Sequence, residues 1–253
     1  METLIPTFLK RRLHPTQRYG LRLTLFLFAI ALVAVPFVYL LVQVLSKGPL
    51  VRLDTAAARN LPGFARRSKL LRSTLELISF FGWPPWFWVL IGGVALNLFI
   101  RGRKRLVAFL LSSTMLGSLL NGLVKTAVNR PRPAIERVGR VFYLDKSFPS
   151  GHAMTSTIAY GALLLIFIPT VKRRWRAPVI ALYPLLVSAI AFSRLALGVH
   201  YISDVLGGIV LGLAWLTAST AAFSIWRTER GQEPVHPIEG VEPEAAKDLT
   251  LGA

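Results

Sequence analysis

The chain of 253 residues contains no cysteine, which excludes disulfide bonds, thiol catalysis and cysteine metal sites. Acidic side chains are also scarce, since there are 12 Asp and Glu residues against 30 Lys and Arg residues. Between the first and last apolar runs, the acidic residues are Asp54, Glu76, Glu136, Asp145 and Asp204. They are too few and too scattered for a two-metal catalytic cluster, so we expect neither a metal nor another cofactor.

Charged residues make up only 17% of the chain, whereas hydrophobic residues make up 53% and the mean hydropathy is +0.53. This composition is typical of a polytopic membrane protein. The first long run is too long for the core of a signal peptide and no small-residue cleavage site follows it, so we expect it to be retained. We predict an all-α fold in which six transmembrane helices form one bundle and one domain over residues 21–226. Runs long enough to cross about 30 Å of hydrocarbon occupy residues 21–45, 83–100, 106–124, 153–169, 178–197 and 205–226.

The formal net charge is +18, but the basic residues lie in short clusters between the apolar runs. Anionic lipid headgroups are therefore the expected partners, and nucleic acid is not. With six spans, the clusters at 10–12, 101–105 and 172–176 fall on one side with Arg227, and the positive-inside tendency makes that side cytoplasmic. We expect a multi-pass protein of the cell (inner) membrane with both termini in the cytoplasm. The tail over 227–253 is rich in Glu, Pro and Ala and is predicted to be disordered, and the basic tail 1–20 is expected to lie on the cytoplasmic surface.

Two interpretations of residues 46–81 stay open. Basic and apolar residues alternate there, which is consistent with an interfacial helix on the outer leaflet, or with a solvated loop that includes a short core-facing helix. The aromatic and proline residues at 83–88 indicate a membrane-anchoring belt at the start of the second span and not a ligand box.

The stretch from 193 to 204 places Arg194, His200 and Asp204 between two long apolar runs. If the chain is helical after Tyr201, His200 and Asp204 fall on one face, where the carboxylate can accept a hydrogen bond from one imidazole nitrogen. The other nitrogen then stays unprotonated and nucleophilic. Gly198 can act as a hinge that brings the Arg194 guanidinium toward the same ring. The alternative is that these are boundary residues whose side chains extend to the headgroups.

Two further segments carry groups that suit an anion. Lys125 ends the third span, and the proline-broken segment after it holds Arg132 on a turn that can fold back. Two close cations repel unless an anion lies between them, although both could instead extend to headgroups. The fourth span begins at Ser150, Gly151 and His152, where unpaired amides and the helix dipole attract phosphate oxygens. With six spans, all of these residues lie at one membrane face; His152 as a simple helix cap is the alternative.

Lys125-x6-Arg132-Pro133, Pro149-Ser150-Gly151-His152 and Ser193-Arg194-x5-His200-x3-Asp204 together resemble the signature motifs of the type 2 phosphatidic acid phosphatase family. The resemblance covers roughly residues 106–226, and the six-span layout is similar to that of the bacterial integral-membrane branch of the family. It implies a haloperoxidase-like helical core and metal-independent dephosphorylation of a membrane lipid phosphate through a phosphohistidine. It also implies the roles of the residues: His200 as nucleophile, Asp204 as its support, His152 as acid and base, and a phosphate cage of Lys125, Arg132, Ser150, Gly151 and Arg194.

The same motifs are also compatible with other functions. A lipid-phosphate-binding membrane protein without turnover would keep the same pocket, and a haloperoxidase would bind vanadate in such a cage. Intact His152, His200 and Asp204 argue against the first, and six spans argue against the second. The motifs do not distinguish undecaprenyl diphosphate, phosphatidylglycerophosphate and phosphatidic acid as substrates, nor do they fix the oligomeric state. The positive-inside tendency predicts an active site on the extracytoplasmic side.

Overall fold

The computed structural model describes residues 21–133 and 146–249, and within these ranges every regular element is a helix. The predicted basic tail over 1–20 lies outside the described residues. The all-α prediction is confirmed. The helices are α2 (Leu21–Leu45), α3 (Leu50–Ala65), α4 (Lys69–Phe80), α5 (Pro84–Ile100), α6 (Lys104–Val128), α7 (Gly151–Phe167), α8 (Arg173–Ala196), α9 (Ile202–Glu229) and α10 (Ala246–Leu249), with 3-10 turns η1 (Ile168–Thr170) and η2 (Pro243–Ala245).

The long helices match the six apolar runs expected from the sequence. Among the described residues, α2, α6, α7, α8 and α9 are each long and apolar enough to cross a membrane. The helix α5 has 17 residues and spans only about 25 Å by itself. It joins α4 at a bend of 45°, and this bent pair makes a sixth span if it is counted as one. The protein is therefore an integral membrane protein with five to six candidate spans.

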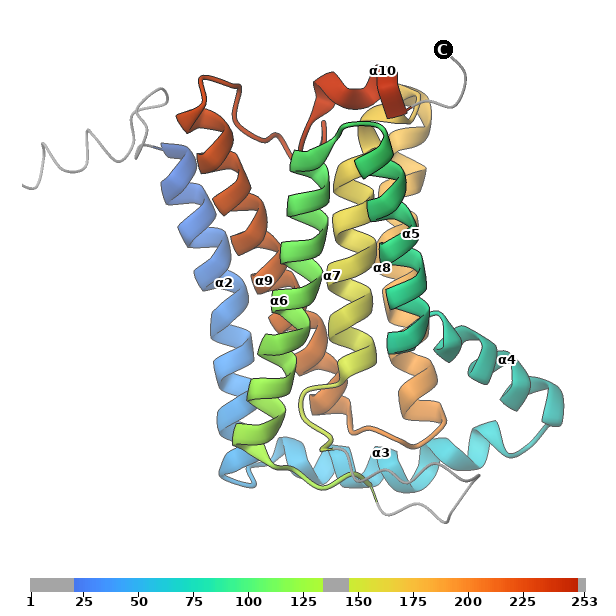
Figure 1. Ribbon diagram of the computed structural model, residues 1–253. Helices are drawn as coiled ribbons and strands as arrows, with labels where there is room; N and C mark the ends of the chain where they lie inside the picture. Colours follow the sequence, from blue (N-terminus) through green and yellow to red (C-terminus); the bar gives the residue numbers. More distant parts are fainter. Residues whose placement is uncertain (1–20, 134–145, 250–253) are drawn as a thin grey trace, which may run out of the picture.

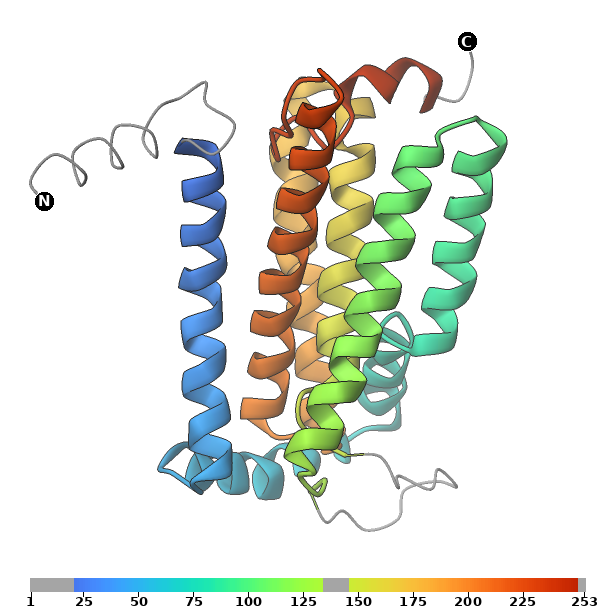
Figure 2. The same ribbon diagram turned by 60° about the vertical axis from the view of Figure 1, so that its left-hand side comes forward.

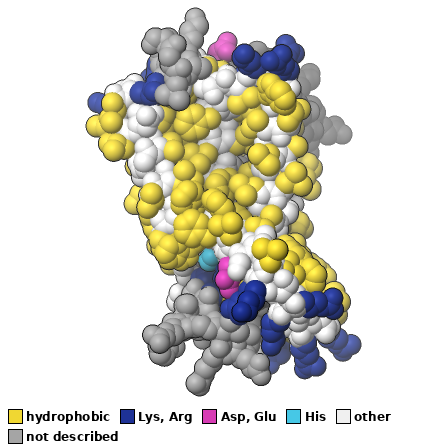
Figure 3. All heavy atoms as spheres, turned by 90° about the vertical axis from the view of Figure 1, so that its right-hand side faces the viewer, with side chains coloured by type: hydrophobic (Ala, Val, Ile, Leu, Met, Phe, Trp, Pro, Cys, Tyr) yellow, Lys and Arg dark blue, Asp and Glu magenta, His cyan; other side chains and the backbone are white. Residues whose placement is uncertain are grey.

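The bundle is built around α7, which is the most buried of the candidate spans. It packs against α5, α6, α8 and α9, while α2 lies on the outside along α9 (Figures 1 and 2). Small residues of α7 such as Ala159 and Ala162 are fully buried and let its neighbours approach closely. The face seen in Figure 3 carries a broad apolar belt with basic side chains at both ends. Such a belt matches the hydrocarbon layer of a bilayer.

The segment 46–81 folds as two helices at one end of the bundle, and α3 runs across the ends of the spans (Figure 1). It packs against α8 and α9. The buried residues of α3 are Asp54, Pro62 and Ala65. Of these three, Asp54 is the one with a charged side chain. Residues 46–81 therefore form two helices instead of a mainly solvated loop. Whether the outer surface of these helices contacts a membrane leaflet stays a prediction.

The predicted disorder of the C-terminal tail is not what the structure has over 230–249. The tail folds back over the ends of the spans, where Val235, Val241 and Ala245 join the main hydrophobic core. The amide of Val241 donates to the Leu165 carbonyl at 3.0 Å, and Arg227 donates to Glu244 at 2.7 Å. The few apolar residues are too widely spaced to form a periodic pattern, which is why composition alone predicted disorder. Residues 250–253 lie outside the described part.

Candidate active site

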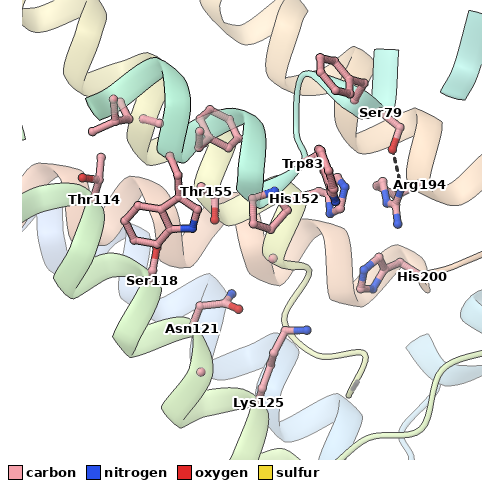
Figure 4. Close-up of a pocket in the computed structure, with 18 of the residues that line it drawn as sticks. Ser79, Trp83, Thr114, Ser118, Asn121, Lys125, His152, Thr155, Arg194 and His200 are labelled. Carbon is pink, nitrogen blue, oxygen red and sulfur yellow. Dashed lines mark hydrogen bonds between the residues drawn. The ribbon is translucent and has the colours of Figure 1, made fainter. Parts of the chain in front are cut away.

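The three motifs meet in one cavity of about 700 Å³ near the α3 end of the bundle. The C-terminal part of α6, the start of α7 and the junction of α8 with α9 all reach this end (Figure 1). In Figure 4, the side chains of His152, His200, Lys125 and Arg194 surround a common space. Of the eight residues expected at the site, those that line the cavity are Lys125, Arg132, Gly151, His152, Arg194 and His200.

The His200 imidazole lies just before α9 and is almost completely buried. Its Nδ1 atom is 3.4 Å from Oδ2 of Asp204, and its Nε2 atom is 3.3 Å from Nη1 of Arg132. A guanidinium can only donate, so Nε2 is the acceptor of this pair and the ring proton is assigned to Nδ1, facing Asp204. The lone pair of Nε2 therefore accepts from Arg132, and the ring is one of the groups that line the cavity.

The pairing of His200 with Asp204 arises from a helix cap. The spacing predicted one helical face, but α9 begins only at Ile202 and His200 precedes it. Asp204 occupies the third helical position and its Oδ2 atom accepts the Tyr201 amide at 2.9 Å. Gly198, at φ +70°, makes the turn between α8 and α9, as expected for a hinge without a side chain.

Three cationic side chains line the cavity together with the imidazoles. Lys125 lies in the last turn of α6 and its Nζ atom donates to the Lys146 carbonyl at 2.8 Å. The helix ends at Asn129 in a left-handed conformation, after which Arg132 reaches back to the Val199 carbonyl at 3.1 Å. Arg194, from the last turn of α8, donates to the Ser79 hydroxyl. Cations so close together favour an anion between them.

The start of α7 presents its backbone to the same space. A Cβ atom on Gly151 would lie 3.6 Å from Oδ1 of Asn121 and 3.9 Å from Cε of Lys125, so this glycine lies beside the Lys125 side chain. The Ser150 hydroxyl accepts from the Ala153 amide at 3.5 Å and caps the helix. Ser150 is fully buried and is not among the cavity-lining residues, unlike Gly151 and His152.

The sequence interpretation missed two groups of residues. Trp83, Phe87 and Trp88 line the cavity, so the aromatic cluster expected only to anchor the second span also forms a wall of the site. Arg130 and Asp54 lie directly behind Asp204, because Arg130 donates to both carboxylates at 2.7 Å. Arg130 had a sequence signal, since it belongs to the same proline-broken segment as Arg132. The one sequence signal for Asp54 was that it is an isolated acidic residue in a basic stretch.

Fold and site together define a class: a helical membrane protein with a cavity lined by cations and by an imidazole that is paired with a carboxylate. Residues 106–227, slightly less than half of the chain, match the model of the PAP2 superfamily.

Similar proteins include phosphatases of several bacteria. A phosphatidylglycerophosphatase B of Bacillus subtilis is 34% identical over 98 residues, covering 38% of this chain and 47% of that protein. A lipid A 1-phosphatase of Rhizobium etli is 30% identical over 122 residues, with 45% and 48% covered. A decaprenylphosphoryl-5-phosphoribose phosphatase of Mycobacterium tuberculosis is 36% identical over 127 residues, with 49% and 62% covered. The chain thus spans about half the length of the curated relatives it matches.

The fold also matches a solved structure. The crystal structure of a transmembrane PAP2 type phosphatidylglycerolphosphate phosphatase from Bacillus subtilis superposes with a TM-score of 0.66 at 23% identity. The match covers 76% of this chain and 94% of that chain. A TM-score of 0.66 means that the two chains share their fold, and the superposition therefore supports the arrangement of the membrane helices.

Proposed function

We propose that this protein is a membrane phosphatase that removes the terminal phosphate of a membrane lipid phosphate or diphosphate without a metal ion. The observation that carries the proposal is the position of His200 Nε2, which lies in a cavity lined by three cations while Nδ1 faces Asp204. The negative charge on the phosphate oxygens repels the lone pair of an attacking nucleophile, and nearby cations remove this barrier by neutralising the charge. Two similar proteins are named as lipid phosphatases, which supports hydrolysis of a lipid phosphate as the reaction class.

The first step forms a bond between His200 Nε2 and phosphorus as the bond from phosphorus to the leaving oxygen breaks. His152 donates a proton to that oxygen, so the lipid leaves as an alcohol, or as a monophosphate when the substrate is a diphosphate. Asp204 stabilises the positive charge that develops on the imidazole by holding the Nδ1 proton. In the second step His152 takes a proton from water, the resulting hydroxide attacks phosphorus, and the bond to Nε2 breaks to release phosphate.

The phosphate oxygens would be held by Lys125, Arg132 and Arg194 together with the Gly151 amide at the start of α7. A helix N-terminus adds unpaired amides and a favourable dipole to such a cage. The Ser150 hydroxyl accepts from the Ala153 amide at 3.5 Å and keeps its own proton to donate, but Ser150 does not line the cavity and would have to turn toward it to reach a phosphate. Phosphoryl transfer consists mainly of positioning and charge stabilisation, so this set of groups is sufficient for the reaction.

The apolar wall of the cavity supports a lipid substrate. Trp83 and Trp88 line the cavity yet are 47% and 56% exposed, so its mouth opens on the apolar outer surface. A lipid could place its headgroup among the cations while its chain stays in hydrocarbon, which avoids the cost of leaving the bilayer. Undecaprenyl diphosphate, phosphatidylglycerophosphate and phosphatidic acid all fit this description. We propose from the positive-inside tendency that this site faces the extracytoplasmic side of the cell membrane.

The test is release of inorganic phosphate from a panel of these three lipids in mixed micelles, with and without chelator, and with a short water-soluble phosphate ester for comparison. We expect turnover of at least one lipid, survival of activity in chelator and inhibition by vanadate. His200→Ala is the matched control for contaminating phosphatase. Binding of a lipid phosphate without turnover, or activity that returns to a chelated protein only with magnesium, would contradict the proposal.

A further inference from the structure

Behind the candidate nucleophile lies a second layer of charge that the reaction scheme leaves unused. Asp54 of α3 is completely buried although it comes from a helix at the surface of the bundle. Its Oδ1 atom accepts the Ser203 amide at 2.9 Å, and its Oδ2 atom accepts the Ser203 hydroxyl at 2.5 Å. Ser203 is the second residue of α9, so Asp54 caps the helix that carries Asp204 from outside that helix.

Arg130 connects this carboxylate to Asp204. Its Nη2 atom donates to Oδ2 of Asp54 at 2.7 Å, and its Nη1 atom donates to Oδ1 of Asp204 at 2.7 Å. The guanidinium also lies over the Tyr201 ring, 4.1 Å from its centroid. A planar fork with several donors can bridge two carboxylates in one fixed geometry, which a lysine cannot do. The position of Asp204 is thereby set from α3, from the segment after α6, and from its own helix.

The charge balance explains why two carboxylates share one guanidinium. Oδ1 of Asp204 faces Arg130, and Oδ2 faces His200 Nδ1 at the longer distance of 3.4 Å. A carboxylate paired wholly with an arginine has less negative charge left to stabilise an imidazolium. Asp54 takes the other side of the guanidinium, and the buried set of Asp54, Arg130 and Asp204 keeps a formal charge of −1, by adding −1, +1 and −1.

We infer that Asp54 and Arg130 are positioning residues, which fix the orientation and charge of Asp204 and through it the tautomer of His200. The inference rests on the proposed function for its catalytic consequence, but the effect on the His200 ring does not depend on turnover. Asp54 thus links a surface helix to the reacting imidazole. Neither residue lines the cavity, so both act through Asp204.

The activity test compares Asp54→Asn and Arg130→Lys with wild type on the lipid that the panel identifies. We expect kcat to fall by about 100-fold, the size of effect that a small misplacement of a reacting group produces, while KM changes little because the cavity lining is intact. Arg130→Lys keeps the charge and should still lose activity, because it cannot bridge both carboxylates. Thr55→Ala, on the exposed side of α3, and Glu239→Gln, which also removes one negative charge, are the matched controls and should behave as wild type.

The second measurement is ¹⁵N NMR of the histidine side chains, which is practical because the chain has only four histidines. His200→Ala identifies the His200 signals. We expect one tautomer with the proton on Nδ1 in wild type, and a mixture of tautomers in Asp54→Asn and Arg130→Lys. If Asp54→Asn does not fold, as judged by its circular dichroism, Arg130→Lys decides the question.

The outcomes separate the two proposals. A wild-type protein that hydrolyses no lipid, but whose His200 tautomer changes in Asp54→Asn, would contradict the proposed function and leave the positioning role intact. Normal kcat with an unchanged His200 spectrum in the variants would overturn the positioning role. Loss of kcat with an unchanged His200 spectrum would overturn it as well, because the residues would then act by another route.

Discussion

At the scale of single residues, substitutions of His200 and Asp204 have different expected effects because only His200 would form a bond to phosphorus in the proposed mechanism. We predict that His200→Ala abolishes turnover, whereas Asp204→Asn keeps a slow residual rate, since the nucleophile remains but its tautomer and charge support are lost. The measurement is phosphate release, followed by trapping of labelled phosphate that is stable in base and labile in acid. Wild-type rates in His200→Ala would exclude the covalent mechanism.

The sequence predicted the groups that line the cavity better than those that support it. Lys125, Arg132 and Arg194 could be recognised because a cation at the end of an apolar run is unusual and needs a reason. Asp54 could not be paired with Asp204 from the sequence, because 149 residues separate Asp54 from Ser203 and no local pattern encodes the way α3 crosses the bundle. The contact of His200 with Asp204 was expected on a helical face, and the cap geometry at Tyr201 became visible only in the structure.

At the scale of elements, the close approach of α7 and α9 holds the start of α7 at the site. A Cβ atom on Gly208 would lie 2.6 Å from the backbone oxygen of Ser150. We predict that Gly208→Ala destabilises the protein by about 1–3 kcal/mol, the usual cost of overpacking a core, and lowers activity by displacing Gly151 and His152. Thermal unfolding in detergent measures the first effect.

The control for this substitution is Gly93→Ala in α5. No atom lies within 4 Å of a Cβ placed there, so alanine should leave activity unchanged and raise stability slightly through its better helix propensity. Equal effects of the two substitutions would mean that the approach of α9 to Ser150 does not matter for the site.

The C-terminal tail should respond to pH in two opposite ways. Burial raises the pKa of Glu242, and the charge of Glu244 acts in the same direction. Burial, the largest single cause, acts to raise the pKa of Glu244, but the hydrogen bonds it accepts and the charges of Arg227 and Arg105 together outweigh burial, so the pKa is lowered overall. A raised carboxyl pKa favours docking at low pH, and a lowered one favours docking at high pH.

Glu244→Gln removes one cause of the raised Glu242 pKa, but burial, the larger cause, remains, so docking of the tail should weaken as pH rises above the usual value of 4.5. In Glu242→Gln, docking should weaken as pH falls from the usual value through the lowered pKa of Glu244. Hydrogen exchange of the Val241 amide, corrected with the free tail peptide, reports docking. Slopes of the same sign in the two variants would contradict these shifts.

Long apolar runs predicted α2 and α5 to α9 because a membrane-spanning helix needs little more than length and hydrophobicity. The tail over 230–249 has neither property, and its order depends on Val235 and Val241 reaching the core together with ion pairs to Arg227. Such cooperation among distant residues leaves no periodic signal in the sequence. Residues 66–68, which separate α3 from α4, likewise contain no proline or glycine that would have predicted the break.

At the scale of the whole molecule, the prediction concerns which face of the membrane holds the site. The chain has no cysteine, so single cysteines can be placed at Ser68, exposed between α3 and α4, and at Ala177, exposed near the start of α8. We expect an impermeant thiol reagent to label Ser68→Cys but not Ala177→Cys in intact cells, and both after permeabilisation. Labelling of Ala177→Cys alone would reverse the orientation.

The aromatic wall of the cavity also makes the protein its own spectroscopic reporter. Trp83 and Trp88 line the cavity, while Trp175 and Trp226 lie at the opposite end of the spans. A lipid phosphate carrying bromine atoms on its chain should quench emission from the first pair as it binds, even in His200→Ala, where nothing is consumed. Replacing Trp83 and Trp88 with Phe should remove most of that quenching. Substrate arrival could then be timed separately from the chemistry.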